Sequence, residues 1–297
     1  MKKHFSKIAI LLVICMCLPL FAACDKNNGK NDKTSAEEFS ETEAKTERMT
    51  ENETETETET ETETEDVQYS QGLNFTSNGD GTCYVSGIGG CTDTTVWIPK
   101  KTPAGDVVTS IGDEAFFKCD KLTSIVIPKG VTSIGKRAFN RCSSLESIVI
   151  REGVTSIGNA AFSGCSSLES IVIPEGVTSI GGSAFEGCDS LTSIVIPDSV
   201  TSIGNSAFEY CKSLESIVIP EGVTSIGLAA FGECSSLTSI VIPEGVTSID
   251  NDAFEYCKSL ETVYFAGTEK EWAKISIDSG NNYLKNANIV FNYVPEE

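Results

Sequence analysis

Cysteine is the residue with the widest chemical range in this chain, which has 12 cysteines and a single histidine. Seven of the cysteines recur every 23 residues, and none forms a CxxC pair, so their spacing does not match a zinc site. They are Cys119, Cys142, Cys165, Cys188, Cys211, Cys234 and Cys257. We interpret this series as a ladder of free, buried thiols that act as small apolar groups.

Other catalytic chemistry finds little support in the sequence. The only histidine, His4, lies in a segment that we predict to be removed on export, which excludes imidazole-based triads and zinc sites from the mature chain. There is no P-loop and no GxGxxG opening a helix, and the recurring Glu146, Glu169 and Glu215 are expected on the surface rather than paired in a cleft. The sequence therefore predicts a non-enzyme without cofactor or metal.

Cys24 is a candidate for a different modification. Residues 1–23 begin with lysines and continue as an apolar run of 16 residues, which is typical of an export signal and short for a membrane span. The run ends in FAAC, which resembles the lipobox of bacterial lipoproteins, although Phe21 departs from the usual aliphatic residue. We expect diacylglyceryl attachment at Cys24, which would supply the two chains that stable anchoring needs. The alternative is an ordinary secretory signal cut near Ala23.

The recurring residues of the chain are positioned by a 23-residue unit that occurs seven times without a gap, starting at Val108. Its second copy reads VTSIGKRAFNRCSSLESIVIREG, and the period indicates a solenoid whose units bury their apolar sides against each other. LESIVI is a short strand rich in β-branched residues. VTSIG is a second extended piece, and we expect its final glycine, as in Gly135, to have a positive φ. The Ala-Phe segment between them is predicted to be a short helical or 3₁₀ turn.

Stacking of the units places one phenylalanine from each in a continuous internal file. Parallel neighbours would lie ~4.8 Å apart, beyond the usual ~3.8 Å Cβ separation of a disulfide, so the cysteine ladder is expected to stay reduced. One unit cannot offset its own ordering entropy, which predicts caps at both ends. The phenylalanines are Phe116, Phe139, Phe162, Phe185, Phe208, Phe231 and Phe254.

The pattern LxxIxIPxxVTSIGxxAFxxC resembles the BspA-like leucine-rich repeats of bacterial surface proteins over about residues 72–294. The resemblance implies a mainly β solenoid, a right-handed coil with the LxxIxI strands on its main sheet. It also implies a group often linked to adhesion and protein binding, and it brings no catalytic residues.

Around the repeats of residues 108–268 we predict four further segments. Residues 1–23 are the signal and residues 24–66 a disordered acidic stalk, in which residues 37–66 have a net charge of −12. Residues 67–107 form an N-terminal cap with a hairpin at Asn78–Gly81, a run that we prefer as a turn over a calcium loop. Cys83 and Cys91 are a possible disulfide there. Residues 269–297 form the C-terminal cap, with Trp272 in its core.

Recognition is the chemistry that remains. The outward side of the LxxIxI strands carries a file of Val126, Val149, Val172, Val195, Val218 and Val241 that ends in Tyr264. This file is a candidate surface for an extended partner, or valine simply suits a strand there. The units vary mainly on the turn side, for example at Glu209-Tyr210, where sequence alone does not separate drift from a second binding face.

The net charge of residues 67–297, 14 basic against 27 acidic groups, disfavours nucleic acid. Taken together, the export signal, Cys24 and the repeats lead us to expect an exported, lipid-anchored protein on the extracellular side or in the envelope. We expect it to bind an extracellular protein or glycan. The alternative is a structural spacer without a specific ligand.

Overall fold

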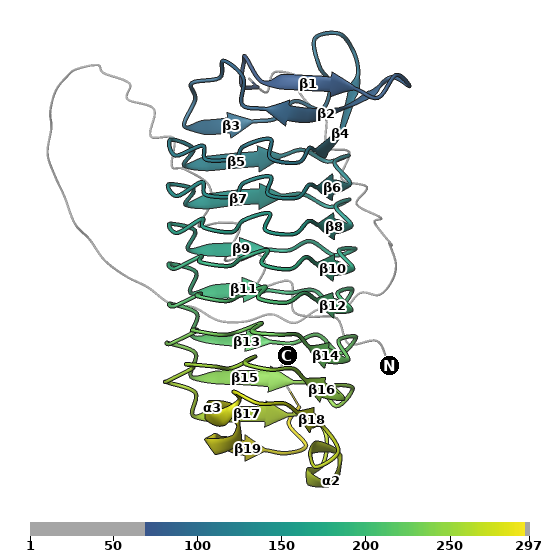
Figure 1. Ribbon diagram of the computed structural model, residues 1–297. Coiled ribbons are helices and arrows are strands. Elements are labelled where there is room, and N and C mark those ends of the chain that lie inside the picture. The colour runs from purple at the N-terminus through teal and green to yellow at the C-terminus, as the bar shows by residue number, and fades with distance from the viewer. Residues whose placement is uncertain (1–68, 295–297) are drawn as a thin grey trace, which may run out of the picture.

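The computed structural model describes residues 69–294, which form a stack of coils with two strand-bearing faces (Figure 1). The face formed by the LxxIxI segments contains β3 (Thr95–Trp97), β5 (Ser124–Ile127), β7 (Ser147–Ile150), β9 (Ser170–Val172), β11 (Ser193–Val195), β13 (Ser216–Val218), β15 (Ser239–Ile242), β17 (Thr262–Phe265) and β19 (Asn288–Val290). The VTSIG face contains β1 (Asn74–Ser77), β2 (Thr82–Gly87), β4 (Val107–Ile111), β6 (Ser133–Ile134), β8 (Ser156–Ile157), β10 (Ser179–Ile180), β12 (Ser202–Ile203), β14 (Ser225–Ile226), β16 (Ser248–Ile249) and β18 (Ser276–Ile277). The predicted β solenoid is confirmed.

Neighbouring coils pair in parallel and in the register that the repeat requires. Ile125 lies opposite Ile148 in the pairing of β5 with β7, and Ile134 lies opposite Ile157 in the pairing of β6 with β8. Each position of the unit therefore stacks on the same position of the next unit, 23 residues later. The threonine that opens VTSIG strengthens this contact, since the Thr155 hydroxyl and the Thr155 amide both donate to the carbonyl of Thr132.

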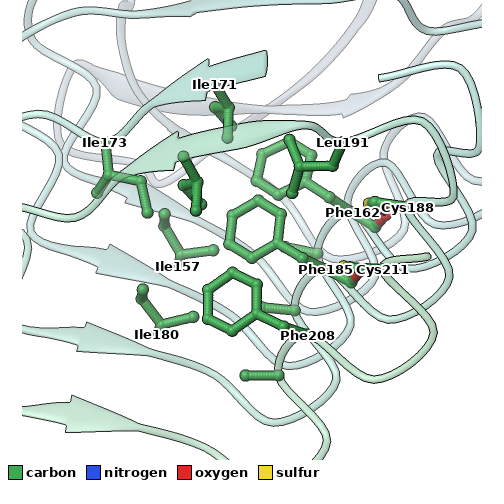
Figure 2. Packing of buried hydrophobic residues seen from close by; sticks show 14 of the residues in the cluster. Ile157, Phe162, Ile171, Ile173, Ile180, Phe185, Cys188, Leu191, Phe208 and Cys211 are labelled. Carbon is green, nitrogen blue, oxygen red and sulfur yellow. Dashed lines mark hydrogen bonds between the residues drawn. The ribbon is translucent and has the colours of Figure 1, made fainter. Parts of the chain in front are cut away.

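The core is the stack of seven phenylalanines, all with no exposed surface (Figure 2). Ring centroids of neighbours lie 5.1–5.4 Å apart, and the rings are nearly parallel, with interplanar angles of 2–18°. Isoleucines from both strand faces and one leucine per coil surround the stack, as Ile157, Ile171 and Leu191 do around Phe162 and Phe185 in Figure 2. The rings therefore belong to one continuous core rather than to separate ones.

The Ala-Phe segment differs from its prediction, because it consists of consecutive turns and not of a helix or 3₁₀ helix. Alternate amides in it point in different directions. Ala138 and Asn140 donate within their own coil, to carbonyls three residues back, whereas Arg137 and Phe139 donate to the next coil, to Asn159 and Ala161 at 2.9 and 2.7 Å. This turn side is thus a third hydrogen-bonded ladder along the solenoid.

The role predicted for the VTSIG glycines was wrong. Gly112, Gly135, Gly158, Gly181, Gly204 and Gly227 do not have positive φ, and neither does Asp250 in the last repeat. A Cβ on Gly158 would instead lie 2.7 Å from the carbonyl carbon of Gly135 in the coil before it. Close approach of neighbouring backbones, not a left-handed conformation, is therefore what requires glycine there.

Strand pairing is interrupted on both faces at one level, which we call the seam. Among the described strands, β11 does not pair with β13 and β12 does not pair with β14, although each pairs with its other neighbour. Figure 1 shows the wider step between these rungs. The turn side stays continuous across the seam, where the amides of Ser206 and Phe208 donate to Leu228 and Ala230, both at 2.8 Å. The seam is therefore held by the turn ladder and the phenylalanine stack, together with the Lys212–Asp189 ion pair and one long bond from the Glu215 amide to the Thr192 carbonyl, at 3.3 Å.

Distinct structures close the two ends of the stack. β1 and β2 form an antiparallel hairpin over Asn78–Gly81, and β2 pairs with β4 of the first repeat. At the other end α2 (Glu269–Trp272) has a Thr268 capping box, and the Trp272 ring meets the Phe265 ring edge-on at 5.2 Å. α3 (Asn282–Asn286) was not predicted; the fully buried Asn281 before it accepts from the Phe254 amide and donates to the Asp250 carbonyl.

Candidate interaction surfaces

The valine file lies on the LxxIxI face, as alternation along the strands predicted. Val195 and Val218, which flank the seam, are 48% and 46% exposed, whereas the other valines and Tyr264 are half-buried. Tyr264 also packs against Tyr293, with ring centroids 4.5 Å apart. The file is therefore a uniform apolar strip whose most exposed part lies at the seam; pairing on this face is also interrupted between β7 and β9, where the valines stay half-buried.

A second file runs along the turn side, at the position two residues after each core phenylalanine. We call it the turn file, and its chemistry changes from coil to coil. Every member has positive φ, between 56° and 75°. The side chains are exposed or half-buried. The turn file consists of Lys118, Arg141, Gly164, Gly187, Tyr210, Glu233 and Tyr256.

Hydrogen bonds to the next coil hold the turn file from Lys118 to Glu233 in this conformation. The amides of Arg141, Gly164 and Tyr210 donate to carbonyls of the following coil at 2.7–2.8 Å. A left-handed conformation is unfavourable for a bulky side chain such as tyrosine. Sequence reasoning noted variation at Tyr210 and Tyr256 but missed the backbone geometry that links them.

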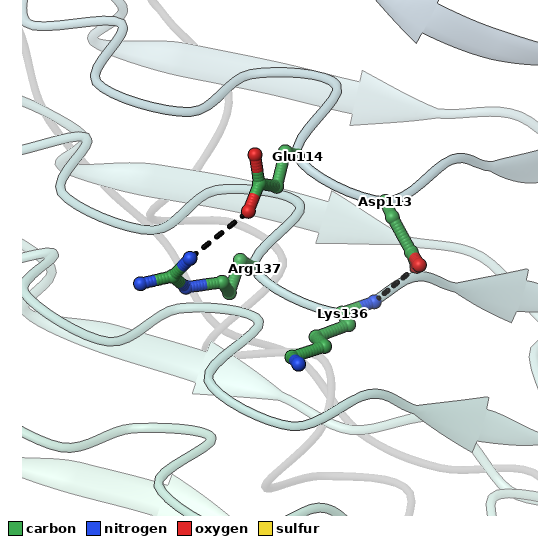
Figure 3. Close-up of polar contacts among 4 residues, drawn as sticks. All are labelled: Asp113, Glu114, Lys136 and Arg137. Atoms are coloured by element: carbon green, nitrogen blue, oxygen red, sulfur yellow. Dashed lines mark hydrogen bonds and ion pairs between the residues drawn. The ribbon is translucent and has the colours of Figure 1, made fainter.

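The first two repeats carry a basic cluster on the turn side. Lys118 and Arg137 lie over the Phe117 ring, at 5.1 and 5.6 Å from its centroid. Arg137 pairs with Glu114 at 3.0 Å, and the Asp113 carboxylate accepts from the Lys136 amide at 2.7 Å (Figure 3). Residues 100–151 hold nine of the 14 basic residues of the region after residue 66, against five acidic ones. Charge is thus unevenly distributed along the solenoid.

The other end of the turn file is aromatic and acidic. Tyr210 and Tyr256 are 40% and 44% exposed, and each follows a glutamate. Lys258 lies 5.8 Å from the centroid of the Tyr256 ring, and Lys212 pairs with Asp189 at 3.1 Å. The two tyrosines therefore stand out of the surface with polar groups at their sides.

The structure places the repeat cysteines in the core, with one exception. From Cys142 onward each is fully buried, and its thiol donates to the carbonyl of the phenylalanine of the preceding coil, 2.9–3.3 Å away. Burial raises the pKa of Cys165 and of Cys257 to about 12. Cys119, in the first repeat, is only half-buried, and a hydrogen bond with the Cys142 thiol lowers its pKa. The buried thiols stay protonated at neutral pH and are not nucleophiles.

Cys83 and Cys91 are not joined, so the possible disulfide is wrong for this structure. Both are free, Cys83 buried and Cys91 half-buried. Cys83 is the second residue of β2 and lies opposite Ser77 in the hairpin, whereas Cys91 follows the far end of β2 and lies beside Gly72. The two cysteines are therefore at opposite ends of the hairpin.

Acidic groups in the described part of the chain do not form a metal-binding cluster. No group of three or more His, Cys, Asp or Glu side chains there could hold a metal ion. Asp80, in the hairpin turn, accepts hydrogen bonds from the side chain and amide of Thr82, which lower its pKa. Glu146, Glu169 and Glu215 are exposed, each on a different coil. Asp80 is thus used to close the turn.

The predicted signal, Cys24 and the stalk lie outside the described residues. Within residues 69–294, no helix has the length and apolar character needed to cross a membrane.

Comparison with known proteins gives a consistent result. A family profile described as "BspA type Leucine rich repeat region (6 copies)" matches residues 100–215 and 155–282. A leucine-rich repeat protein from T. pallidum has a similar structure, with a TM-score of 0.58 and 28% identity over 64% of this chain and 88% of that one. A leucine-rich repeat protein from Bacteroides ovatus ATCC 8483 has a TM-score of 0.55 and 28% identity over 77% of this chain and 71% of that one. No curated protein matches the sequence.

Proposed function

Because the chain belongs to the BspA type leucine-rich repeat family, we propose that it is a non-catalytic interaction module displayed outside the cell. In this proposal Cys24 is the lipid anchor and residues 24–66 are the stalk that holds the solenoid away from the membrane. The partner is an extracellular protein or glycan.

The observation that carries the proposal is the contrast between a repetitive interior and a variable turn file. The core positions and both strand faces repeat almost unchanged, because each coil must fit the next. The turn file instead presents cationic, small, aromatic and acidic residues on a backbone that is fixed by coil-to-coil hydrogen bonds. Selective binding needs such differences between neighbouring positions on a rigid support.

A pull-down from extracellular matrix and cell-wall extracts tests binding, with the soluble fragment 67–297 as bait. A binding module retains a partner that is released when turn-file residues are replaced, for example in an Arg141→Ser, Tyr210→Ser variant. A matched variant, Val172→Ser with Val241→Ser, tests whether retention of the partner depends on the valine file. If neither surface affects retention, or if nothing is retained, the spacer alternative is favoured; the uniform sheet face is the observation that speaks for that alternative.

Metabolic labelling with palmitate tests the anchor. We expect label in the chain and its loss in a Cys24→Ala variant. If the natural chain carries no labelled fatty acid, the lipid anchor is contradicted, but the binding proposal still stands.

A further inference from the structure

We infer that the Tyr210–Tyr256 end of the turn file is a stacking site for an extended, neutral, β-1,4-linked glycan that runs along the axis of the solenoid. This inference rests on the proposed binding function, and it names the surface and the class of partner.

Two exposed tyrosines in a strained backbone are the first observation. Tyr210 and Tyr256 have φ values of 62° and 56°, at a position where Gly164 and Gly187 occupy other coils with φ values of 75° and 69°. Glycine adopts this conformation without strain, whereas tyrosine does not. The rings are 40% and 44% exposed and are not part of the core, so packing does not explain them. An unfavourable residue kept at two equivalent exposed positions points to a role at the surface.

The two sites are copies of each other and share one orientation. Both lie in the sequence EYCKSLE, and in both the lysine amide donates to the tyrosine carbonyl, at 2.9 Å for Lys212 and 2.8 Å for Lys258. Their backbones also have nearly the same φ. The two tyrosines therefore leave the turn side from the same backbone conformation, two coils apart.

Their separation can be taken from the core beneath them. The ring centroids of Phe208, Phe231 and Phe254 are spaced by 5.4 Å at each step, so the tyrosines, two residues after the first and last of these, lie about 11 Å apart. Glu233 occupies the same position on the coil between them. In an extended β-1,4-linked chain, one sugar unit advances the chain by about the length of one coil step. Alternate sugars present the same face, so two sugars with the same face are about two coil steps apart. Two tyrosines would stack on sugars one and three, and Glu233 would accept hydrogen bonds from sugar two.

Peptides fit this spacing less well. Side chains on one face of an extended peptide recur every two residues, about 6.7 Å, and about 11 Å is not a multiple of that distance. A polyproline II helix repeats every three residues, about 9.3 Å, which would place the second ring out of register.

The local charge selects a neutral glycan. Glu209 and Glu255 directly precede the two tyrosines, Glu233 occupies the turn file between them, and one of the two nearby lysines, Lys212, is already paired with Asp189. Negative charges repel uronate or sulfate groups, so polyanionic glycans are disfavoured. The carboxylates and Lys258 are suited to hydrogen bonds with sugar hydroxyls.

Calorimetry on the full chain tests the site, with cellohexaose, xylohexaose and mannohexaose as probes. We expect at least one of these to bind, and we expect Tyr210→Gly or Tyr256→Gly to weaken that binding roughly tenfold by removing one stacking partner. Because glycine fits the backbone at these positions, both variants should melt at the same temperature as the natural chain or higher. A purely structural role of the tyrosines would instead lower the melting temperature.

Moving one tyrosine provides the matched control. The variant Tyr256→Gly with Gly164→Tyr restores a pair two coils apart and should recover binding, whereas Tyr256→Gly with Gly187→Tyr leaves a pair one coil apart and should not. Binding that is unchanged by the loss of both tyrosines, or binding of a proline-rich peptide but of none of the three glycans, would overturn the inference. Retention of an extracellular protein through Arg141 or the valine file would then still support the proposed function.

Discussion

Gly181 offers a sharp test of why the repeat needs glycine after VTSI. A methyl group on this residue would lie 2.6 Å from the amide nitrogen of Asn159 and 2.6 Å from the carbonyl carbon of Gly158, where ordinary contacts are 3.4–4 Å. Both atoms belong to the backbone of the preceding coil and cannot rotate away. Gly181→Ala must therefore push two coils apart.

The cost follows from the bonds that hold those coils together. Relief of the contact needs a local separation of about 0.8 Å, which would stretch the Gly181 amide to Ile157 carbonyl bond from 3.0 Å beyond hydrogen-bonding distance. The Thr178 amide to Thr155 carbonyl bond, at 3.1 Å, lies on the same face. Loss of one or two such bonds at about 1 kcal/mol each, together with residual overpacking, predicts a destabilisation of about 2–4 kcal/mol.

Gly182 is the matched control, because it is the next residue along the same turn. A methyl group there would approach a single backbone oxygen, that of Asn205, at 3.3 Å, and no other atom closer than 3.8 Å. We expect Gly182→Ala to cost less than about 1 kcal/mol. The assay is urea unfolding followed by tryptophan fluorescence, with comparison of midpoints and slopes. Equal losses of unfolding free energy for the two alanine variants would refute close approach. A smaller loss for Gly181→Asn than for Gly181→Ala would also refute it, since asparagine tolerates positive φ better than alanine does.

Three further predictions follow from the same structure. Stability should fall as the pH rises from about 9 towards 12, because unfolding lowers the pKa of Cys165 and Cys257 from about 12 to about 9, so the folded chain holds more protons there; the loss is on the order of 1 kcal/mol per pH unit for each thiol. Alanine at both positions should make the decline measured by urea titration shallower, and the other buried thiols, whose pKa values are also raised, account for the decline that remains. Phe185→Ala should cost about 3–5 kcal/mol and Phe185→Leu clearly less, by the same unfolding assay, because the ring is fully buried between two others. Hydrogen exchange should be faster in β14 than in β10, since β14 lacks its partner across the seam and β10 is paired on both sides; equal protection of the two strands would contradict the seam.

The architecture was predictable from the sequence because a strict 23-residue period leaves few ways to bury the apolar positions. Each Phe, Leu and Ile returns to the same place, so one coil determines the next, and the stack of Phe116 to Phe254 follows directly. The same repetition hid the local details. A glycine that is constant in every coil, such as Gly158, has the same sequence signature whether it serves positive φ or close approach. The seam is not marked by any change in VTSIG or LxxIxI.

The valine file was predictable from strand alternation, whereas the turn file was not. Positive φ at Arg141 or Tyr210 contradicts residue preference, and at both positions it accompanies an amide bond to the next coil. One signal was present: Gly164 and Gly187 occupy the frame position of Tyr210 and Tyr256, which hinted that the backbone at this position suits glycine. The disulfide prediction failed because sequence separation said nothing about the extended path of β2 after Cys83.

The turn file shows how a repeat protein can change its surface without changing its fold. On the strand faces, a residue must match its neighbours above and below, because side chains there pack in register and the backbone is pleated against the core. On the turn side, the backbone ladder is complete without the side chains: Tyr210 and Glu233 each donate an amide to the following coil, at 2.8 and 2.7 Å, although their side chains differ completely. Substitution there alters the chemistry of the surface at the cost of local strain alone. Selection for a partner can therefore act on this file independently of selection for stability, and a surface that varies from coil to coil is the expected result.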